Sequence, residues 1–467
     1  MKIQRLSIGR GAALSMALLA AVLLSGCAGS APERAARTAT GFASHQLCSA
    51  VFVSGTPREQ AYRELLAPMG GALLDIRVDD ERREVSTRIA GFAQSRAVYR
   101  EGAGCVLAPE GVTPAAVNAP AAASKPSPEE DRVVEPASAA LRAALDRAFA
   151  ETGSAPHRFT KAVVILREDR IVAERYAPGV GVHTPLAGWS ATKSVVNALL
   201  GVLVRQGRLR MDAPAPVPEW SASGDPRRAI TPDQLLRMQS GLDLGESLRA
   251  SFIVMFDPSA QMIFLHPDSA RIAAAAPLGA PPGARWNYTN ANTQLLSRIL
   301  LQQAGGTPEA FLAFARRELF DKIGMRDTVF EFDAAGTPIG ASHLLASARD
   351  WARFGQLYLH DGVAGGERIL PEGWVDYSAA ATPGSEVYGY GAGFWTERGE
   401  GEGQRYRRAR GLPADSFMAR GALGQYVIVV PSERLVAVRL GIARTERDDA
   451  DTMIDMVREA IEATRPR

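Results

Sequence analysis

Two predicted strand hairpins lie near opposite ends of the region formed by residues 137–467. They cover residues 162–176 and 426–440, and each consists of two short apolar runs separated by a charged turn. Apolar residues at helical spacing precede the first hairpin, over residues 138–152, and follow the second, over residues 450–463. A sheet that uses both hairpins must bring the two ends of this region together, with the helices packed against it. The pattern therefore predicts an α/β (α+β) layered domain.

The stretch between the hairpins is mostly helical in its periodicity, and residues 194–301 predict a helical lobe that faces the sheet. A hydrophobic content of 46% with 22% charged residues is typical of a globular protein with a sizeable core. The formal net charge is only +2 and no long basic run is present, so we expect no nucleic-acid partner.

The part of the chain before this domain divides into shorter segments. Residues 111–136 are rich in Ala and Pro, which predicts an exposed linker and a domain boundary. Residues 45–110 contain short alternating stretches between charged turns, which predict a small β-rich module. Residues 28–44 are small and polar, as expected for a tether.

Residues 1–27 are typical of a secretory signal. Three basic residues precede an apolar stretch over residues 12–24, which is too short for a span of ~20 residues. The sequence Leu-Ser-Gly-Cys that ends at Cys27 resembles a bacterial lipobox, which implies lipidation of Cys27 and anchoring to a membrane. Ala28 after the cysteine implies a periplasmic protein sorted to the outer membrane. The alternatives are a cleaved signal without lipid and an uncleaved anchor.

Two cysteines remain once Cys27 is set aside. In a compartment where disulfides persist, Cys48 and Cys105 are expected to bond to each other and close the module; the alternative is two buried free thiols. Their separation does not suit zinc, and the six histidines form no paired motif, so we predict no metal site.

Ser190 and Lys193 stand three residues apart at the start of a predicted helix, residues 195–204. This spacing puts both side chains on one face, with Cβ atoms about 5–6 Å apart. A neutral lysine can accept the serine proton, and burial would lower its pKa enough to make it neutral. The backbone amide of Ser190, at the helix N-terminus, can donate to a developing oxyanion. The motif therefore predicts Ser190 as nucleophile and Lys193 as base.

The rarity of lysine makes this motif more specific. The basic residues are mostly arginine, and only Lys193 has a serine three positions before it. A guanidinium cannot act as a base at neutral pH, whereas an amine can. The alternative is an ordinary surface serine and lysine in the first turn of a helix. The five lysines are Lys2, Lys125, Lys161, Lys193 and Lys322.

Tyr288 and Asn290 form the only Tyr-x-Asn sequence of the chain. A phenol beside Ser190 and Lys193 could relay a proton to the leaving group and later activate water, and the amide of Asn290 could bind a substrate carbonyl. The tripeptide is common, so the alternative is a tyrosine that covers the core.

These motifs together resemble the serine β-lactamase and penicillin-binding protein superfamily, with segments 230–236 and 240–242 between them adding to the likeness. The closer resemblance is to its branch of esterases and 6-aminohexanoate-dimer hydrolases. It covers the region after the linker and implies an antiparallel sheet flanked by helices, an all-helical lobe, and an active site between them. It also implies that Ser190 is acylated, that Lys193 is the base, and that Tyr288 is the catalytic tyrosine.

The third motif of the family departs from its usual form. Lactamases and penicillin-binding proteins carry Lys-Thr-Gly on a strand beside the site, and the matching residues here are Ala419, Arg420 and Gly421. A glycine lets the backbone approach closely, so Gly421 would contact substrate and the amide of Ala422 would be the second oxyanion donor. Without the lysine, recognition of β-lactams or stem peptides is weakened unless Arg420 points inward. The alternative is an ordinary glycine turn.

The sequence as a whole predicts a cofactor-free serine hydrolase that cleaves a small-molecule ester or amide through an acyl-enzyme. Two alternatives remain open. One is a β-lactamase or D-alanyl-D-alanine carboxypeptidase-like enzyme, and the other is a catalytically silent envelope lipoprotein that binds a partner. The sequence contains no Gly-x-Ser-x-Gly elbow, which argues against an α/β-hydrolase triad.

Overall fold

The computed structural model describes residues 29–89, 93–109, 112, 114, 116–120, 131–151, 157–248, 255–444 and 446–464. The predicted signal segment and lipidation site, residues 1–27 with Cys27, lie outside the described residues. Within those residues, no helix combines the length and the apolar character needed to cross a bilayer.

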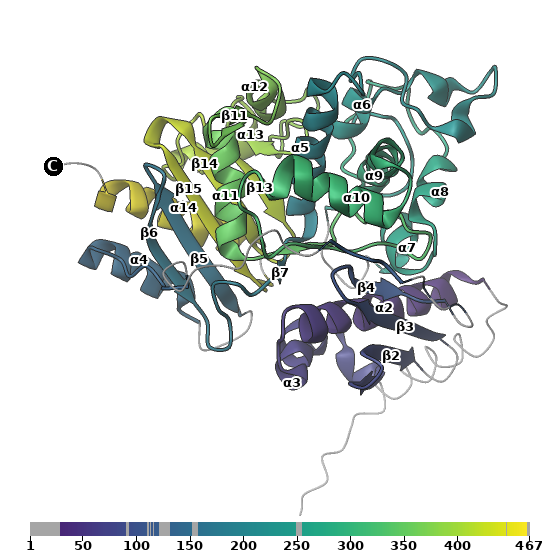
Figure 1. Cartoon of the computed structure of the whole chain (residues 1–467), viewed down its shortest axis with the longest axis horizontal. Helices are drawn as coiled ribbons and strands as arrows, with labels where there is room; N and C mark the ends of the chain where they lie inside the picture. Colours follow the sequence, from purple (N-terminus) through teal and green to yellow (C-terminus); the bar gives the residue numbers. More distant parts are fainter. Residues whose placement is uncertain are drawn as a thin grey trace, which may run out of the picture.

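A six-stranded antiparallel sheet forms the centre of the larger domain, with strands in the order β12-β13-β14-β15-β5-β6. Strand β15 pairs with β5, so that Val438 lies opposite Val164. Figure 1 shows this as yellow strands from the end of the chain beside blue strands from its first half. The prediction of a sheet assembled from two distant hairpins is confirmed. The strands are β5 (Thr160–Arg167), β6 (Arg170–Tyr176), β12 (Trp395–Thr396), β13 (Phe417–Gly421), β14 (Gln425–Val430) and β15 (Leu435–Gly441).

Helices cover both faces of this sheet. Val163 and Ile165 of β5 join a core cluster with α4 (Ala139–Phe149) and α14 (Glu446–Thr464). Val164 and Leu166 point the opposite way, because side chains alternate along a strand, and join the cluster that contains α11 (Ala348–Leu359). All eight residues of β5 are buried, which explains why the strand reads as a continuous apolar run.

A helical lobe packs beside the sheet, as the sequence predicts (Figure 1). Its central helix α5 is buried along nearly its whole length, since it carries apolar or small residues on every side. The lobe consists of α5 (Thr192–Arg205), α6 (Pro232–Leu236), α7 (Pro258–Phe264), α8 (Ser269–Ala274), α9 (Asn290–Ala304) and α10 (Pro308–Ala315). The remaining short elements are β7 (Leu186–Ala187), β8 (Val329–Phe330), β9 (Leu344–Ala346), β10 (Val363–Ala364), β11 (Glu367–Arg368), α12 (Trp374–Ala379) and α13 (Glu402–Ala409).

The N-terminal module is a four-stranded antiparallel sheet, in the order β1-β2-β3-β4, covered by helix α2 (Ala31–Cys48). A disulfide joins Cys48, at the end of α2, to Cys105 in β4 with a Cα–Cα distance of 6.1 Å, which confirms the predicted pairing. The module lies against the helical lobe (Figure 1, purple). Its other elements are β1 (Asp75–Asp79), β2 (Glu84–Ile89), β3 (Ala93–Arg100), β4 (Gly104–Leu107) and α3 (Arg58–Ala61).

The prediction of a tether over residues 28–44 is wrong from Ala31 onward. Ser30 caps α2 through its side chain, and the helix is buried over most of its second half. The small residues serve close packing: a Cβ atom on Gly41 would lie 2.0 Å from the carbonyl oxygen of Phe264. Small side chains therefore allow the backbones of α2 and α7 to approach each other, rather than leaving the segment without a partner.

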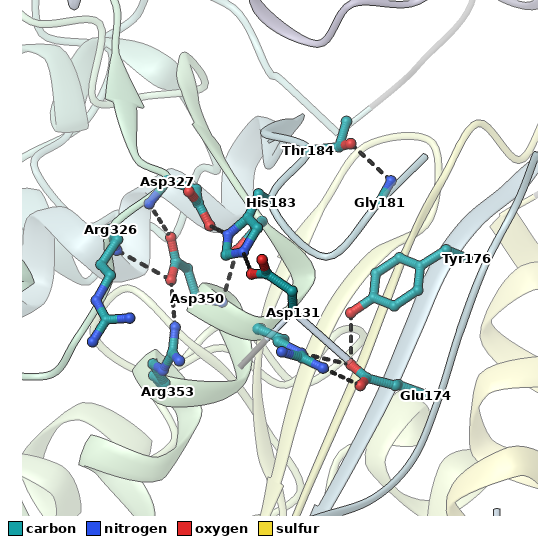
Figure 2. Close-up of polar contacts among 12 residues, drawn as sticks. Asp131, Glu174, Tyr176, Gly181, His183, Thr184, Arg326, Asp327, Asp350 and Arg353 are labelled. Atoms are coloured by element: carbon teal, nitrogen blue, oxygen red, sulfur yellow. Dashed lines mark hydrogen bonds and ion pairs between the residues drawn. The ribbon is translucent and has the colours of Figure 1, made fainter. Parts of the chain in front are cut away.

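The segment predicted as an exposed linker, residues 111–136, is attached to the larger domain at the points that the structure describes. Val117 is buried in the main core cluster. Figure 2 shows the imidazole of His183 between two carboxylates, with Asp131 and Asp327 each 2.8 Å from a ring nitrogen. These contacts join the end of the segment to the larger domain.

Candidate active site

Ser190 lies in a short 3₁₀ helix (Trp189–Ala191) that leads directly into α5. The next turn places Lys193 beneath it, with Nζ 3.1 Å from Ser190 Oγ. Two further oxygens accept from the same amine: Asn290 Oδ1 at 2.8 Å and the carbonyl oxygen of Ala341 at 2.7 Å. Lys193 is only 1% exposed, so its nitrogen makes all three contacts with protein oxygens. The neutral amine can donate its two N–H groups to Asn290 and Ala341 and accept from the Ser190 hydroxyl.

The surroundings of Lys193 favour the neutral amine. Its partners are a hydroxyl, an amide and a backbone carbonyl, and in the described parts of the chain no ion pair to it is found. Burial lowers the pKa of Lys193 to about 7, because the charged form loses its hydration without gaining a carboxylate. At neutral pH, Lys193 is therefore uncharged in a large fraction of the protein molecules.

Tyr288 precedes Thr289, the N-cap of α9, and is only 2% exposed. The Lys193 Nζ atom is 5.1 Å from the centroid of its ring. Burial raises the pKa of Tyr288 to about 12, although a hydrogen bond with Ser190 and the charge of Arg420 act in the opposite direction. The phenol therefore holds its proton at neutral pH and lies where it can donate.

Aromatic packing fixes the position of this phenol. The Tyr288 ring lies 5.3 Å from the ring of Trp395 and 5.5 Å from that of Tyr390, the latter edge to face. Such contacts add about 0.5–1.5 kcal/mol each beyond the burial of area. The tyrosine is thus held among rings contributed by a segment about a hundred residues later in the chain.

Asn290 is the first residue of α9, which Thr289 caps. Its amide oxygen accepts from Lys193, so the side chain orients the amine and offers only its NH₂ group to a substrate carbonyl. The backbone amide of Asn290 donates to Ser247 Oγ at 3.1 Å, and Ser247 Oγ lies 2.6 Å from Ser259 Oγ. These hydroxyls tie the start of α9 to the loop before α7.

Gly421 ends strand β13 beside the segment that carries Ser190. A Cβ atom on Gly421 would lie 2.1 Å from the carbonyl oxygen of Gly188, so no other residue fits without movement of the backbone. The chain then turns through Ala422, with Leu423 at a φ of +60°. The glycine therefore brings the strand end, and Ala422 with it, beside the start of the Ser190 helix.

Arg420 occupies the place of the lysine that the family motif would carry. Its guanidinium lies 5.5 Å from the ring centroid of Trp395 and 5.6 Å from that of Tyr426. Arg420 is also among the residues that line the cavity with Ser190.

These groups surround one cavity of about 470 Å³. Six of the residues singled out from the sequence line it, and Lys193 contacts Ser190 without being one of the lining residues. The six are Ser190, Tyr288, Asn290, Arg420, Gly421 and Ala422. Several lining residues carry no sequence signal, because they come from segments far from Ser190 in the chain: Phe42, Met69, Met255 and Phe264. The carbonyl of Ala341 was also missed, since a backbone group leaves no mark in a sequence. Within the described residues, no cluster of three or more metal-ligating side chains is found.

Solved structures of the same architecture define the class. A protein of Bacillus anthracis provisionally named a 6-aminohexanoate-dimer hydrolase is similar with a TM-score of 0.57 at 21% identity, over 72% of this chain and 89% of that chain. EstCE1, described as a hydrolase with promiscuous acyltransferase activity, has a TM-score of 0.53 at 18% identity, over 68% of this chain and 96% of that chain. The chain thus has the fold of serine β-lactamases and related esterases, as the resemblance implies.

The family follows from the sequence match. The β-lactamase family model matches residues 145–459, and the chain belongs to this family. A curated relative, the 6-aminohexanoate-dimer hydrolase of Paenarthrobacter ureafaciens, is 27% identical over 289 residues, which are 60% of this chain and 72% of the relative. The family and these relatives support a hydrolase of the β-lactamase fold.

Proposed function

We propose that this protein hydrolyses a small ester or amide through an acyl-enzyme formed on Ser190. One observation carries the proposal: a buried lysine amine lies 3.1 Å from a serine hydroxyl that lines the cavity, with uncharged oxygens around it. Such an amine can be neutral at physiological pH and accept the serine proton.

The arrangement suggests a role for each group. Neutral Lys193 takes the proton of Ser190 as Oγ attacks the substrate carbonyl. The backbone amides of Ser190 and Ala422 donate to the developing oxyanion, and Tyr288 passes a proton to the leaving alcohol or amine. The Lys193 ammonium returns a proton to Tyr288. In the second half, water gives a proton to the neutral Lys193 as it attacks the acyl-enzyme, and that proton passes to Ser190 Oγ as the acid leaves. No cofactor enters this sequence of steps.

The names of the relatives agree with the reaction class but not with one substrate. The curated relative is called a 6-aminohexanoate-dimer hydrolase, whereas the similar solved structures include EstCE1 and a family VIII carboxylesterase. Both esters and amides therefore belong in the first screen.

Arg420 favours a second candidate, a penicillin-recognising enzyme. Because Arg420 lines the cavity, its guanidinium could provide a cation for a substrate carboxylate, in place of the lysine of the family motif. Strong labelling by a fluorescent penicillin that depends on Ser190, or turnover of nitrocefin, would favour this candidate over the esterase. A third candidate is a silent binding lipoprotein, which would react with no acylating reagent.

One screen separates the three candidates. Wild type and Ser190→Ala are tested with p-nitrophenyl esters, short-chain amides and nitrocefin, together with labelling by a fluorophosphonate. We expect ester or amide turnover and fluorophosphonate labelling in the wild type, with both lost in the variant. Failure of labelling and of every turnover would rule out the proposed hydrolase.

We also propose that lipid on Cys27 anchors the protein to the periplasmic side of the outer membrane. The basis is the lipobox-like sequence that ends at Cys27. Incorporation of labelled palmitate into the wild type, and its loss in Cys27→Ala, would test the anchor. Fractionation of the membranes would then test the site of sorting.

A further inference from the structure

The N-terminal module reaches the cavity that contains Ser190. Two of its residues line this cavity. They are Phe42 of α2 and Met69, the last residue of a short 3₁₀ helix (Ala67–Met69). The ring of Phe42 stacks on Trp189 with centroids 6.1 Å apart, and it meets the ring of Phe264 edge to face at 5.3 Å. A residue far upstream of the hydrolase domain therefore touches the residue directly before Ser190.

The apolar wall has contributions from both parts of the chain. Phe42 comes from the module, Trp189 from the start of the Ser190 helix, and Phe264 from the end of α7. Trp189 has a φ of +48°, a strained value for a residue with a side chain, and its partly buried ring stacks on Phe42. The wall therefore depends on the module being in place.

Buried polar contacts hold the module against the hydrolase domain at one end. Lys161 of β5 forms an ion pair of 2.6 Å with Glu64, and both side chains are less than 10% exposed. Arg444, which follows β15, donates to the backbone oxygens of Glu64 at 2.5 Å and Leu65 at 2.8 Å. Breaking a buried pair of this kind is costly because a charge is left without a partner.

A second buried contact holds the module at its disulfide. Glu331 of the hydrolase domain accepts from Ser49 Oγ at 2.8 Å and from the amide of Cys105 at 2.7 Å. His45 Nε2 lies 3.3 Å from the other oxygen of Glu331. With anchors near both Phe42 and Met69, the wall is preformed rather than closed by a substrate.

We propose that the N-terminal module is part of the substrate site, in which Phe42 and Met69 limit the length of the apolar group that an ester can carry beside Ser190. This inference rests on the proposed ester hydrolysis. It assigns the module a role in selectivity, and it names the substrate class as esters with a short apolar chain. A longer chain would have to displace an aromatic ring that is packed on two others.

The test compares chain-length profiles of full-length variants. Phe42→Ala and Met69→Ala remove the two side chains, and Phe52→Ala is the matched control, since Phe52 contacts Tyr99 within the module and does not line the cavity. Values of kcat/KM are measured for p-nitrophenyl esters from acetate to decanoate, and for alkyl butyrates with increasing alcohol length. The two series vary the acyl and the alcohol side separately.

We expect Phe42→Ala to raise the ratio of long-chain to short-chain kcat/KM in one of the two series by about tenfold or more, the range that a methylene-sized change in an apolar pocket produces. Met69→Ala should shift the ratio in the same direction, and Phe52→Ala should leave it unchanged. A ratio is used because a smaller fraction of active enzyme lowers the rates for all chain lengths in proportion. Unchanged ratios in both series for Phe42→Ala and Met69→Ala would overturn the inference.

The fluorophosphonate reaction keeps this result separate from the proposed function. If wild type reacts through Ser190 and turns over short esters, but the variants keep its chain-length profile, only the role of the module is refuted. If wild type neither reacts nor turns over an ester, the proposed function fails and the inference falls with it.

Discussion

Lys193 is the residue on which the proposed chemistry depends. Its amine lies beneath Ser190, receives no carboxylate partner within the described chain, and has three oxygens at 2.7–3.1 Å. Burial alone lowers its pKa to about 7. The spacing of the two residues follows from the sequence, but the low pKa follows from the layers packed around the helix.

The first prediction concerns pH. Because the base must be neutral, log(kcat/KM) for an ester should rise with pH and level off above a midpoint near 7, the pKa of Lys193. Tyr288, whose pKa is raised to about 12, should cause no fall below pH 10. A pH profile between 5 and 10 checks both the rise and the absence of a fall at high pH. A rate that is flat from pH 5 to 9 would contradict a lysine base.

The second prediction replaces the amine by a group that cannot lose its proton. Lys193→Arg keeps a long nitrogen-bearing side chain, but a guanidinium stays protonated and does not act as a base at neutral pH. We expect kcat/KM to fall at least about 10²-fold, the lower range for loss of general acid–base catalysis. Lys322→Arg, at an exposed ion pair with Glu367, is the matched control and should retain activity. Circular dichroism of both variants checks that they fold.

At the scale of elements, hairpins and helices agree closely with the sequence prediction. Strand β5 begins two residues before the first predicted hairpin, and β15 ends one residue after the second. Alternation and apolar runs are local signals, so these elements could be read directly. Helix α2 was misread as a tether because Ala, Thr and Gly form a weak apolar face, whose partner α7 lies more than 200 residues later.

His183 attaches the end of the 111–136 segment to the hydrolase domain, and this contact should depend on pH. Burial lowers the pKa of His183, but hydrogen bonds and charges of Asp327 and Asp131 outweigh that effect and raise it. The raised pKa means that the contact stabilises the fold fully below the unfolded pKa of about 6.5, and that this stabilisation is lost as pH rises through the folded pKa. Thermal melts of wild type and His183→Ala should therefore differ most below pH 6, and the difference should shrink as pH rises through the raised pKa of His183. A difference that is constant with pH would contradict the charged contact.

At the scale of the whole molecule, the module and the hydrolase domain share buried contacts and a cavity wall. The disulfide closes a loop between cysteines 57 positions apart in the module and lies beside Glu331 of the other domain. Its effect should therefore extend beyond the module, since Ser49 and the amide of Cys105 are both bound to Glu331.

The fourth prediction follows from this position. The double variant Cys48→Ala/Cys105→Ala should lose about 2–4 kcal/mol of stability, the usual range for a disulfide that closes a loop of this size. Chemical denaturation followed by tryptophan fluorescence measures the loss, and wild type with and without reductant is the control. If the module docks as observed, limited proteolysis of the variant should also cut within residues 31–107 before the hydrolase domain. Resistance equal to that of wild type would contradict a role of the bridge in docking.

Local sequence determined the hairpins, the helix that begins after Ser190, and the placement of a lysine three residues from a serine, because each depends on spacing along one segment. It also held the motif that identifies the β-lactamase family. Only the tertiary structure decided the groups that complete the site: the carbonyl of Ala341 on the amine, the rings around Tyr288, and Phe42 in the cavity wall. These are contacts between segments far apart in the chain, and their partners are set by how the layers pack, which no local pattern encodes.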